Sequence, residues 1–378
     1  MDPVVFAAMK PYFFNEFGNP GSLHSYGQKA IAAVDASRET IVKAIGAKFR
    51  EIIFTGSATE ANNLALRGAF RAYKKSSQFK EGERSRIIIS TIEHESVMET
   101  ARALEGEGAE VVFAPVTSEG VIDIAKLGYL LSVNTAIVSI MHVNNEIGVV
   151  QPMIEVAKVI ADFKIENHLE KFPLFHTDAA QAVQFFDCSA RTRGVDMMTL
   201  SAHKIYGPKG IGALFIKHDN KGYWPIDAEI TGGGQEFGLR SGTENVPSIV
   251  GFAKAMELAV VARESETKRI GDLRELLWTN IKKVTPQAEI NGPDLKNSSP
   301  HILNVYFPGH QAQDLLIKFD RADIGISTGS ACRSRATEPS YVLEALGLSK
   351  ERSASSIRFS LGRQTTKGDI VKASKLAI

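Results

Sequence analysis

Cysteine is scarce in this sequence: its 378 residues include two, Cys188 and Cys332. Two cysteines far apart in the chain are too few for the disulfide framework of a small secreted protein. They are also too few for a cluster of metal ligands. We therefore expect no metal site and a reducing, cytoplasmic compartment.

Long apolar runs and an excess of charge are also lacking. No stretch approaches the ~20 consecutive apolar residues of a membrane-spanning helix, and the first residues lack the order of a signal peptide. The 44 basic and 43 acidic side chains leave a formal net charge of +1, which gives no indication of a basic surface for nucleic acid. We expect neither a membrane nor a nucleic acid as a partner.

Short apolar runs alternate with segments of helical periodicity along most of the chain. This alternation predicts an α/β protein with a mostly parallel sheet and helices on both faces. The length favours two domains, and a long helix from Pro247 to about Lys283 is a plausible bridge between them. The second domain is predicted from a strand at His301–Phe307, a helix at Gln311–Phe319, a strand near Ser356–Leu361 and a closing helix.

Two of the apolar runs end in residues suited to chemistry. The run from Phe172 to Phe175 leads to Asp178, and the run from Val195 to Leu200 leads to Ser201-Ala202-His203-Lys204. Ligands in α/β sheets bind outside the carboxyl ends of the strands, so an acid, a lysine and polar donors should meet there. This set suits pyridoxal phosphate, in which a lysine forms the Schiff base and an aspartate pairs with the ring nitrogen.

Each of these residues also has an ordinary interpretation. A lysine after a strand is usually a solvated surface residue, and an aspartate before AAQAV can cap a helix. Lys209 competes with Lys204, but its Pro-Gly turn predicts a side chain that points to solvent. Because the combination is more specific than its parts, we predict that Lys204 is the Schiff-base lysine.

Two further strand ends carry candidate residues with two interpretations each. Ser57 and Glu60 fit a capping box at a helix start, and the same helix start could bind an anion such as a phosphate. His94 follows the strand Ile87–Ile89. It is either an ordinary hydrogen-bonded residue or an acid–base group against a planar cofactor ring.

The segment Gly325–Ser340 is small, polar and rich in turn residues, which is typical of an exposed loop. A lone cysteine is usually an inert small hydrophobe, and Cys188, with apolar neighbours, keeps that interpretation. Cys332 instead has Arg333 and Arg335 beside it, and their charges favour the thiolate. We predict Cys332 as the nucleophile.

The motifs of this chain resemble those of the cysteine desulfurases of the iron–sulfur-cluster and nitrogen-fixation branch, in the class V aminotransferase superfamily. The resemblance implies a pyridoxal-phosphate-dependent transferase of fold type I, with a mostly parallel seven-stranded-type sheet in a large domain (15–255). A small α+β domain (1–14 and 256–378) would carry the cysteine loop. The similar stretches span nearly the whole chain in family order: FTGSATEANN, EHES, MHVNNEIGVVQP, HTDAAQ, SAHKIYGPKGIGALFI, GGGQEFGLRSGTEN, STGSACRSRATEPSYVLEALG and SSIRFSLGR.

The resemblance also implies a set of cofactor-binding residues. Lys204 would bind pyridoxal phosphate, Asp178 would pair with the ring nitrogen, and Gln181 would donate to the ring oxygen. His94 would stack on the ring and act as an acid–base group. The phosphate would be held by Ala58, Thr59, Ser201 and His203, with Thr243 of the partner subunit.

Substrate handling follows from the same resemblance. Asn145 would contact cofactor and substrate, and Arg358 would grip the carboxylate of L-cysteine in a bidentate manner. Cys332 would take the sulfur as a persulfide and release alanine. The family forms homodimers, and its long-loop group hands the sulfur to an iron–sulfur scaffold or another acceptor protein.

The sequence departs from the family pattern in three places. The family has an Ala-Thr-Thr-Pro-type segment before the residues that match Asp2-Pro3, a last helix that continues beyond Ile378, and the reverse order of Gly56-Ser57. Two alternatives therefore stand beside a cysteine desulfurase. One is an impaired relative that binds the cofactor and assembly partners, and the other is a selenocysteine lyase or an ordinary class V aminotransferase.

Overall fold

The computed structural model describes residues 1–219, 221–329 and 340–377. Contacts divide the chain into a first unit, made of residues 1–114, 124–142 and 152–262, and a second unit, made of 115–123, 143–151 and 263–378. The helix α9 (Val246–Val284) has residues in both units.

This division differs from the predicted domain ranges at four segments, one of which is residues 256–262, which group with the first unit. Residues 1–14 group with the first unit, because the Asp2 amide donates to the Tyr206 carbonyl and Met9 lies against Gly251. The segments 115–123 and 143–151 group with the second unit, although they connect elements of the first. The Gln151 side chain joins these two segments by hydrogen bonds to Ile122 and Gly120.

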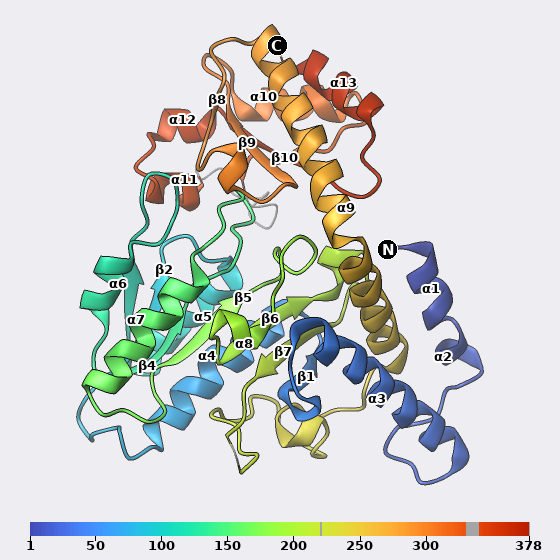
Figure 1. The fold of residues 1–378 in the computed structure, drawn as a ribbon, viewed down its shortest axis with the longest axis vertical. Coiled ribbons are helices and arrows are strands. Elements are labelled where there is room, and N and C mark those ends of the chain that lie inside the picture. Colours follow the sequence, from blue (N-terminus) through green and yellow to red (C-terminus); the bar gives the residue numbers. More distant parts are fainter. Residues whose placement is uncertain (220, 330–339, 378) are drawn as a thin grey trace. The chain divides into compact units, whose positions relative to one another are not determined.

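The first unit is built on a seven-stranded sheet in the order β1-β7-β6-β5-β4-β2-β3 (Figure 1). Strand β7 runs antiparallel to both of its neighbours, and the other pairings are parallel. The mostly parallel seven-stranded sheet predicted from the sequence is therefore confirmed. The strands are β1 (Ile52–Thr55), β2 (Ser85–Ser90), β3 (Ala109–Ala114), β4 (Thr135–Ser139), β5 (Leu174–Asp178), β6 (Met197–Ser201) and β7 (Gly212–Ile216).

Five of these strands, β1, β4, β5, β6 and β7, are buried at every residue. Burial at every residue is expected for strands of a sheet that is covered on both faces. Helix α4 packs across β4, β6 and β7, and α5 covers β2 and β3. The helices of this unit before α9 are α1 (Pro3–Met9), α2 (Pro11–Phe14), α3 (Ser25–Ile45), α4 (Ala58–Lys74), α5 (Glu95–Gly106), α6 (Ile124–Leu130), α7 (Met153–Glu166) and α8 (Ala190–Arg193).

Helix α1 has a capped N-terminus. The Asp2 carboxylate accepts a hydrogen bond from the Val4 amide at 2.9 Å, and Pro3 occupies the first helical position. Helix α3 ends at Gly46, which takes a left-handed conformation (φ 64°). Glycine adopts this conformation without steric cost. None of the helices in the described part of the chain has the length and apolar composition needed to cross a membrane.

The second unit contains an antiparallel sheet in the order β10-β9-β8. Its predicted strands and helix are confirmed within one or two residues, and the closing helix is present. The elements are β8 (Glu289–Ile290), β9 (Ile302–Tyr306), α10 (Ala312–Asp320), α11 (Tyr341–Ala345), α12 (Lys350–Ala354), β10 (Ser356–Ser360) and α13 (Lys367–Leu376).

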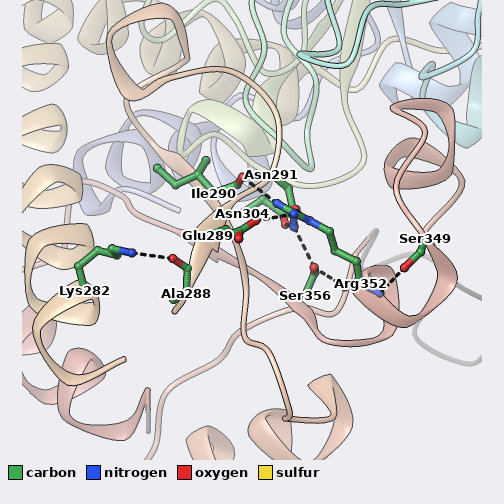
Figure 2. A network of polar contacts seen from close by, with 9 residues as sticks. All are labelled: Lys282, Ala288, Glu289, Ile290, Asn291, Asn304, Ser349, Arg352 and Ser356. Atoms are coloured by element: carbon green, nitrogen blue, oxygen red, sulfur yellow. Dashed lines mark hydrogen bonds and ion pairs between the residues drawn. The ribbon is translucent and has the colours of Figure 1, made fainter. Parts of the chain in front are cut away.

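A polar network centred on Arg352 fastens α12 to this sheet (Figure 2). The guanidinium donates to the Asn291 side-chain oxygen at 2.7 Å and to Glu289 at 2.5 Å. The Asn291 amide in turn donates to Ser356 at 2.8 Å. Because Ser356 opens β10, this network holds the start of the strand that carries Arg358.

Candidate active site

The carboxyl ends of β1, β2, β4, β5 and β6 lie at one edge of the large sheet, because these strands run in the same direction. The predicted residues of the first unit leave the sheet at this edge. Asp178 ends β5, and Ser201 ends β6 beside it, with Asp178 paired to Thr199 across the two strands. The structure therefore brings together the two strand ends that the sequence singled out.

The start of α4 approaches the end of β6 closely. A side chain at Gly212, the first residue of β7, would come within 2.7 Å of Ser57, 2.8 Å of the Ala58 amide and 2.9 Å of the Leu200 carbonyl. The absence of a side chain there is what allows this approach. Ala58 and Thr59 thus begin a helix next to Ser201, whose hydroxyl lies 3.1 Å from the His203 Nδ1.

The capping interpretation of Ser57 is confirmed, but Glu60 has a different role from the predicted one. The Ser57 hydroxyl accepts from the Glu60 amide at 3.1 Å. The Glu60 carboxylate accepts from the Gly56 amide at 2.8 Å and from the Arg240 guanidinium at 2.7 Å. Because the amides of the first helical turn have no intrahelical acceptors, those of Ala58 and Thr59 suit an anion.

Lys204 lies in a short 3₁₀ helix (Ala202–Ile205) directly after β6, and its side chain is exposed. Lys209 is exposed as well, in the following turn, as predicted. Partial desolvation, and then the positive charges of Lys204 and Lys209, lower the pKa of His203. Gln181 is half-buried, three residues after Asp178.

Thr243 lies in the glycine-rich segment 232–245, and this segment is tied to the sheet by a buried ion pair. Arg38 of α3 and Glu236 meet in a two-pronged contact at 2.7 and 2.9 Å, and Glu236 also accepts from the Phe54 amide at 2.8 Å. Within the segment, Glu236–Gly238 form a 3₁₀ turn. Thr243 is exposed and lines a pocket with Thr55, Gly56, Arg240 and other residues.

His94 is the N-cap residue of α5 and is half-buried. Its Nδ1 accepts a hydrogen bond from the Ser96 amide at 3.1 Å and lies 2.8 Å from the Ser96 hydroxyl. His94 is thus hydrogen-bonded through Nδ1, as its ordinary interpretation predicts. The Nε2 atom is the one left for acid–base chemistry.

Glu93, next to His94, was not singled out in the sequence. Its carboxyl group is fully buried and accepts from the Ser90 hydroxyl at 2.5 Å and from the Met141 amide at 2.8 Å. Burial, with a smaller contribution from the charge of Asp178, raises the pKa of Glu93 to about 8 despite these two bonds. Glu93 is therefore protonated at neutral pH.

The free energy of unfolding of the parent protein should fall as pH rises because of Glu93, and we expect Glu93→Gln to remove this fall. The unfolded chain releases this proton near pH 4.5, whereas the folded protein keeps it up to about pH 8. Between these values the unfolded state binds fewer protons than the folded state, so the free energy of unfolding falls as pH rises. Glutamine keeps an acceptor for Ser90 and Met141 and does not titrate.

Urea unfolding at several pH values checks this prediction. The advantage of Glu93→Gln over the parent protein should grow by on the order of a few kcal/mol between about pH 5 and about pH 8. The exposed Glu99, substituted in the same way, is the control and should show no such growth. A difference that is constant with pH would contradict the raised pKa.

The second unit brings together its own predicted residues. The Arg358 guanidinium donates to the Asn145 carbonyl at 2.8 Å, and the Arg358 backbone pairs with Ser327 in both directions, at 2.6 and 3.2 Å. Glu146, which the sequence did not identify as a candidate, accepts from the Ser340 hydroxyl at 2.5 Å. A side chain at Gly329 would lie 3.5 Å from both Glu146 and Ser340.

These contacts involve the residues on both sides of the predicted cysteine loop. Ser327 and Gly329 precede the segment 330–339, and Ser340 follows it, and all three lie beside Asn145, Glu146 or Arg358. Cys332, Arg333 and Arg335 lie outside the described residues. Cys188 is buried, with its Sγ 3.7 Å from the His142 Nδ1, which agrees with its inert interpretation.

The sheet order, the acid at the end of β5 and the lysine after β6 define a transferase of fold type I. The model of the class V aminotransferase family matches residues 1–372. The chain therefore belongs to the class V aminotransferase family, whose members depend on pyridoxal phosphate, and within it to the cysteine desulfurases.

Individual relatives support this assignment. The chain is 41% identical to the cysteine desulfurase IscS of Dictyoglomus turgidum, over 97% of this chain and 88% of the relative. It is also 41% identical to a human cysteine desulfurase, over 98% of this chain and 77% of the relative. A solved structure of a NifS-like protein matches with a TM-score of 0.88 and 34% identity, covering 100% of this chain and 95% of the other.

A second solved structure, SspA in complex with cysteine, matches with a TM-score of 0.78 and 33% identity. The match covers 96% of this chain and 95% of the SspA chain.

The donor set of the first unit fits pyridoxal phosphate. A buried carboxylate ends β5, and the helix start at Ala58 adjoins Ser201, whose hydroxyl is within hydrogen-bond distance of His203. These groups supply a partner for a protonated ring nitrogen and donors for a phosphate. Sequence reasoning found each of them because each directly follows a strand.

Proposed function

We propose that this protein is a pyridoxal-phosphate-dependent cysteine desulfurase. The carbon–sulfur bond of L-cysteine breaks, the sulfur joins the Cys332 thiol as a persulfide, and L-alanine is released. Because only a sulfur atom moves, this step consumes no oxidant or reductant. The persulfide sulfur then serves iron–sulfur cluster assembly or the thiolation of tRNA or a cofactor.

One observation carries the proposal: Asp178 and the segment Ser201–Lys204 leave adjacent parallel strands at the same edge of the sheet. An acid and a lysine at that place suit pyridoxal phosphate. The names of the relatives, cysteine desulfurases at 41% identity over nearly the full chain, support sulfur removal over transamination. The neighbour in complex with cysteine supports the choice of substrate.

When bound, pyridoxal phosphate withdraws electrons from the substrate carbons and so makes the carbon–sulfur bond easier to break. In our proposal Lys204 binds the cofactor through Nζ, and Asp178 keeps the ring nitrogen protonated. Gln181 donates to the ring oxygen, and His94 lies against the ring and moves a proton at Nε2. The phosphate is held by Ala58, Thr59, Ser201 and His203, with Thr243 of the partner subunit.

Residues of the second unit bind the substrate in this proposal. Arg358 pairs with the carboxylate of L-cysteine, and its backbone pairing with Ser327 limits the directions it can take. Asn145, whose carbonyl accepts from Arg358, contacts both cofactor and substrate. Glu146 and Ser340 hold one flank of the segment that contains Cys332.

We also propose a homodimer and a protein that accepts the sulfur. The N-terminal elements expose several large apolar side chains, and exposed apolar surface that is contiguous marks interaction sites. Two of its ring pairs are in contact, with centroids 6.4 and 5.5 Å apart. Its side chains are between 50% and 93% exposed: Phe6, Phe13, Phe14, Phe17, Leu23 and Tyr26.

The compartment stays a prediction. The paucity of cysteine favours a reducing, cytoplasmic one, whereas a relative from Arthroderma benhamiae that is 43% identical is named as mitochondrial.

Product analysis with L-cysteine tests the function. With dithiothreitol, alanine and sulfide should form in equal amounts. Without a reductant, alanine release should stop after about one equivalent per Cys332, because the persulfide is not discharged. Amino transfer that requires a 2-oxo acid and releases no sulfide would contradict a desulfurase.

Asp178→Asn should retain the cofactor but turn over slowly. Asparagine keeps an acceptor for one of the two donors of Asp178 but lacks the charge that keeps the ring nitrogen protonated. We expect the rate of alanine release to fall by roughly 10²-fold or more, as when a preorganised electrostatic contact to the reacting centre is removed. Unchanged turnover would remove Asp178 from the mechanism.

A further inference from the structure

Asn62 connects two residues of the proposed site that come from different strand ends. It lies in the first third of α4 and is completely buried. Its Nδ2 donates to the Asp178 Oδ2 at 2.8 Å and to the Ser96 Oγ at 2.7 Å. The Ser96 Oγ lies 2.8 Å from the His94 Nδ1. The contacts form a continuous chain from Asp178 through Asn62 and Ser96 to His94.

The orientation of the Asn62 amide follows from its partners. A carboxylate offers only acceptors, so the Asp178 oxygen requires the Nδ2 side of the amide. The reverse orientation would set the carbonyl oxygen against the carboxylate. In the described part of the chain the Asn62 Oδ1 has no hydrogen-bond partner, a desolvation cost that the contact with Asp178 offsets.

Asn62 donates both to Asp178 and to Ser96, which sets the direction of the remaining bond. The Ser96 Oγ accepts from Asn62, so its one proton is available for the His94 Nδ1. The Ser96 backbone amide donates to the same Nδ1 at 3.1 Å. Two donors on Nδ1 require that this nitrogen carry no proton, so neutral His94 carries its proton on Nε2.

The titratable groups beside Asp178 are neutral at pH 7. Glu93 keeps its proton because burial raises its pKa to about 8. His176 of β5 has its pKa lowered to about 4 by burial, in spite of the opposing charge of Asp178. Neither Glu93 nor His176 carries a charge that competes with the Asp178 carboxylate for the Asn62 amide.

We propose that Asn62 and Ser96 are positioning residues that hold His94 in the Nε2-protonated form and link it to Asp178. This inference rests on the proposed function, in which His94 moves a proton. Because of this link, His94 gives up and takes up its proton only at Nε2. It also fixes the ring relative to the acid at the end of β5.

Nitrogen NMR of the full-length, cofactor-loaded protein labelled with ¹⁵N-histidine tests the inference. The His94 signals, identified by their loss in His94→Gln, should show the Nε2-protonated form in the parent protein. Ser96→Ala removes the hydroxyl donor and leaves the backbone donor. It should admit a fraction of the Nδ1-protonated form, seen in the signals of both ring nitrogens. Ser96→Thr keeps a hydroxyl and should behave as the parent.

Asn62→Leu tests the link itself, because Asn62 has no contact with His94 among those described. We expect a smaller fraction of the Nδ1-protonated form than in Ser96→Ala, and we expect the double variant to add little to that of Ser96→Ala. The control is Asn63→Leu, at the next position of α4, whose amide donates to the Thr59 carbonyl instead. It should leave the His94 signals unchanged.

Two results would overturn the inference: an Nδ1-protonated His94 in the parent, or a Ser96→Ala protein with the same His94 tautomer populations as the parent. Ser96 is half-buried and its substitution is small, so this variant remains informative even if Asn62→Leu does not fold. The NMR signals need no turnover. A parent that fails to release sulfur from L-cysteine would contradict the proposed function only, whereas an active parent with the other tautomer would contradict this inference only.

Discussion

Lys204→Ala should yield a protein that no longer holds pyridoxal phosphate through a covalent bond and that has almost no turnover. The purified variant should lack the long-wavelength absorbance of the bound cofactor. Alanine release from L-cysteine should fall by roughly 10⁴-fold or more, the size of loss found when a residue that forms a covalent bond in catalysis is removed. The physical reason is its position, directly after β6 and adjacent to His203, at the edge of the sheet where Asp178 ends β5.

Lys209→Ala is the matched control for this prediction. Both lysines are exposed, so accessibility does not distinguish them, and both contribute to the lowered pKa of His203. Lys209 lies in the turn before β7, away from the strand end, and its loss should leave the absorbance intact. A Lys209→Ala protein without bound cofactor, together with a Lys204→Ala protein that keeps it, would assign the wrong lysine.

Cys332→Ser should bind the cofactor and L-cysteine but release almost no alanine, again with a loss of roughly 10⁴-fold or more. A hydroxyl is a far weaker nucleophile than a thiolate near neutral pH, so the substrate sulfur has no acceptor. Lys204 and Arg358 are untouched, so binding of L-cysteine should still change the absorbance of the cofactor. Mass spectrometry of the parent after incubation with L-cysteine should find one extra sulfur on the peptide that contains Cys332.

Cys188→Ser is the control. The Cys188 thiol is buried, and its neighbour His142 has a pKa lowered to about 4, chiefly by burial and then by the charge of Arg193. At neutral pH this imidazole carries no positive charge to stabilise a thiolate. The variant should match the parent. An extra sulfur on Cys188, or full activity of Cys332→Ser, would contradict the proposed mechanism.

The local alternation of apolar runs and helical segments was enough to predict the sheet and most of its strands. Parallel strands covered on both faces must be apolar at nearly every position, so they are visible in the sequence. The residues that follow such strands are visible for the same reason. Asp178, Ser201 and Lys204 were therefore identified in advance, and Ser57 was recognised as a helix cap from its local pattern.

The roles of Asn62, Glu93 and Glu146 were decided by the tertiary structure. Asn62 lies 116 residues before Asp178, and Glu146 lies 194 residues before Ser340, so no local pattern pairs them. Glu93 resembles any acid near a helix start until its burial is known, and burial is what raises its pKa. A hydrogen bond between distant residues, or a desolvated charge, depends on which surfaces pack together.

The sequence by itself determined the class of fold, through its periodicity, and the position of Asp178 and Ser201 at strand ends. The cofactor-binding roles of these residues stay predictions. Only the tertiary structure decided the composition of the two units. The segments 115–123 and 143–151 belong to the second unit through contacts such as those of Gln151 with Ile122 and of Asn145 with Arg358. Such contacts join residues far apart in the chain, and their free energy depends on the folded arrangement rather than on local sequence.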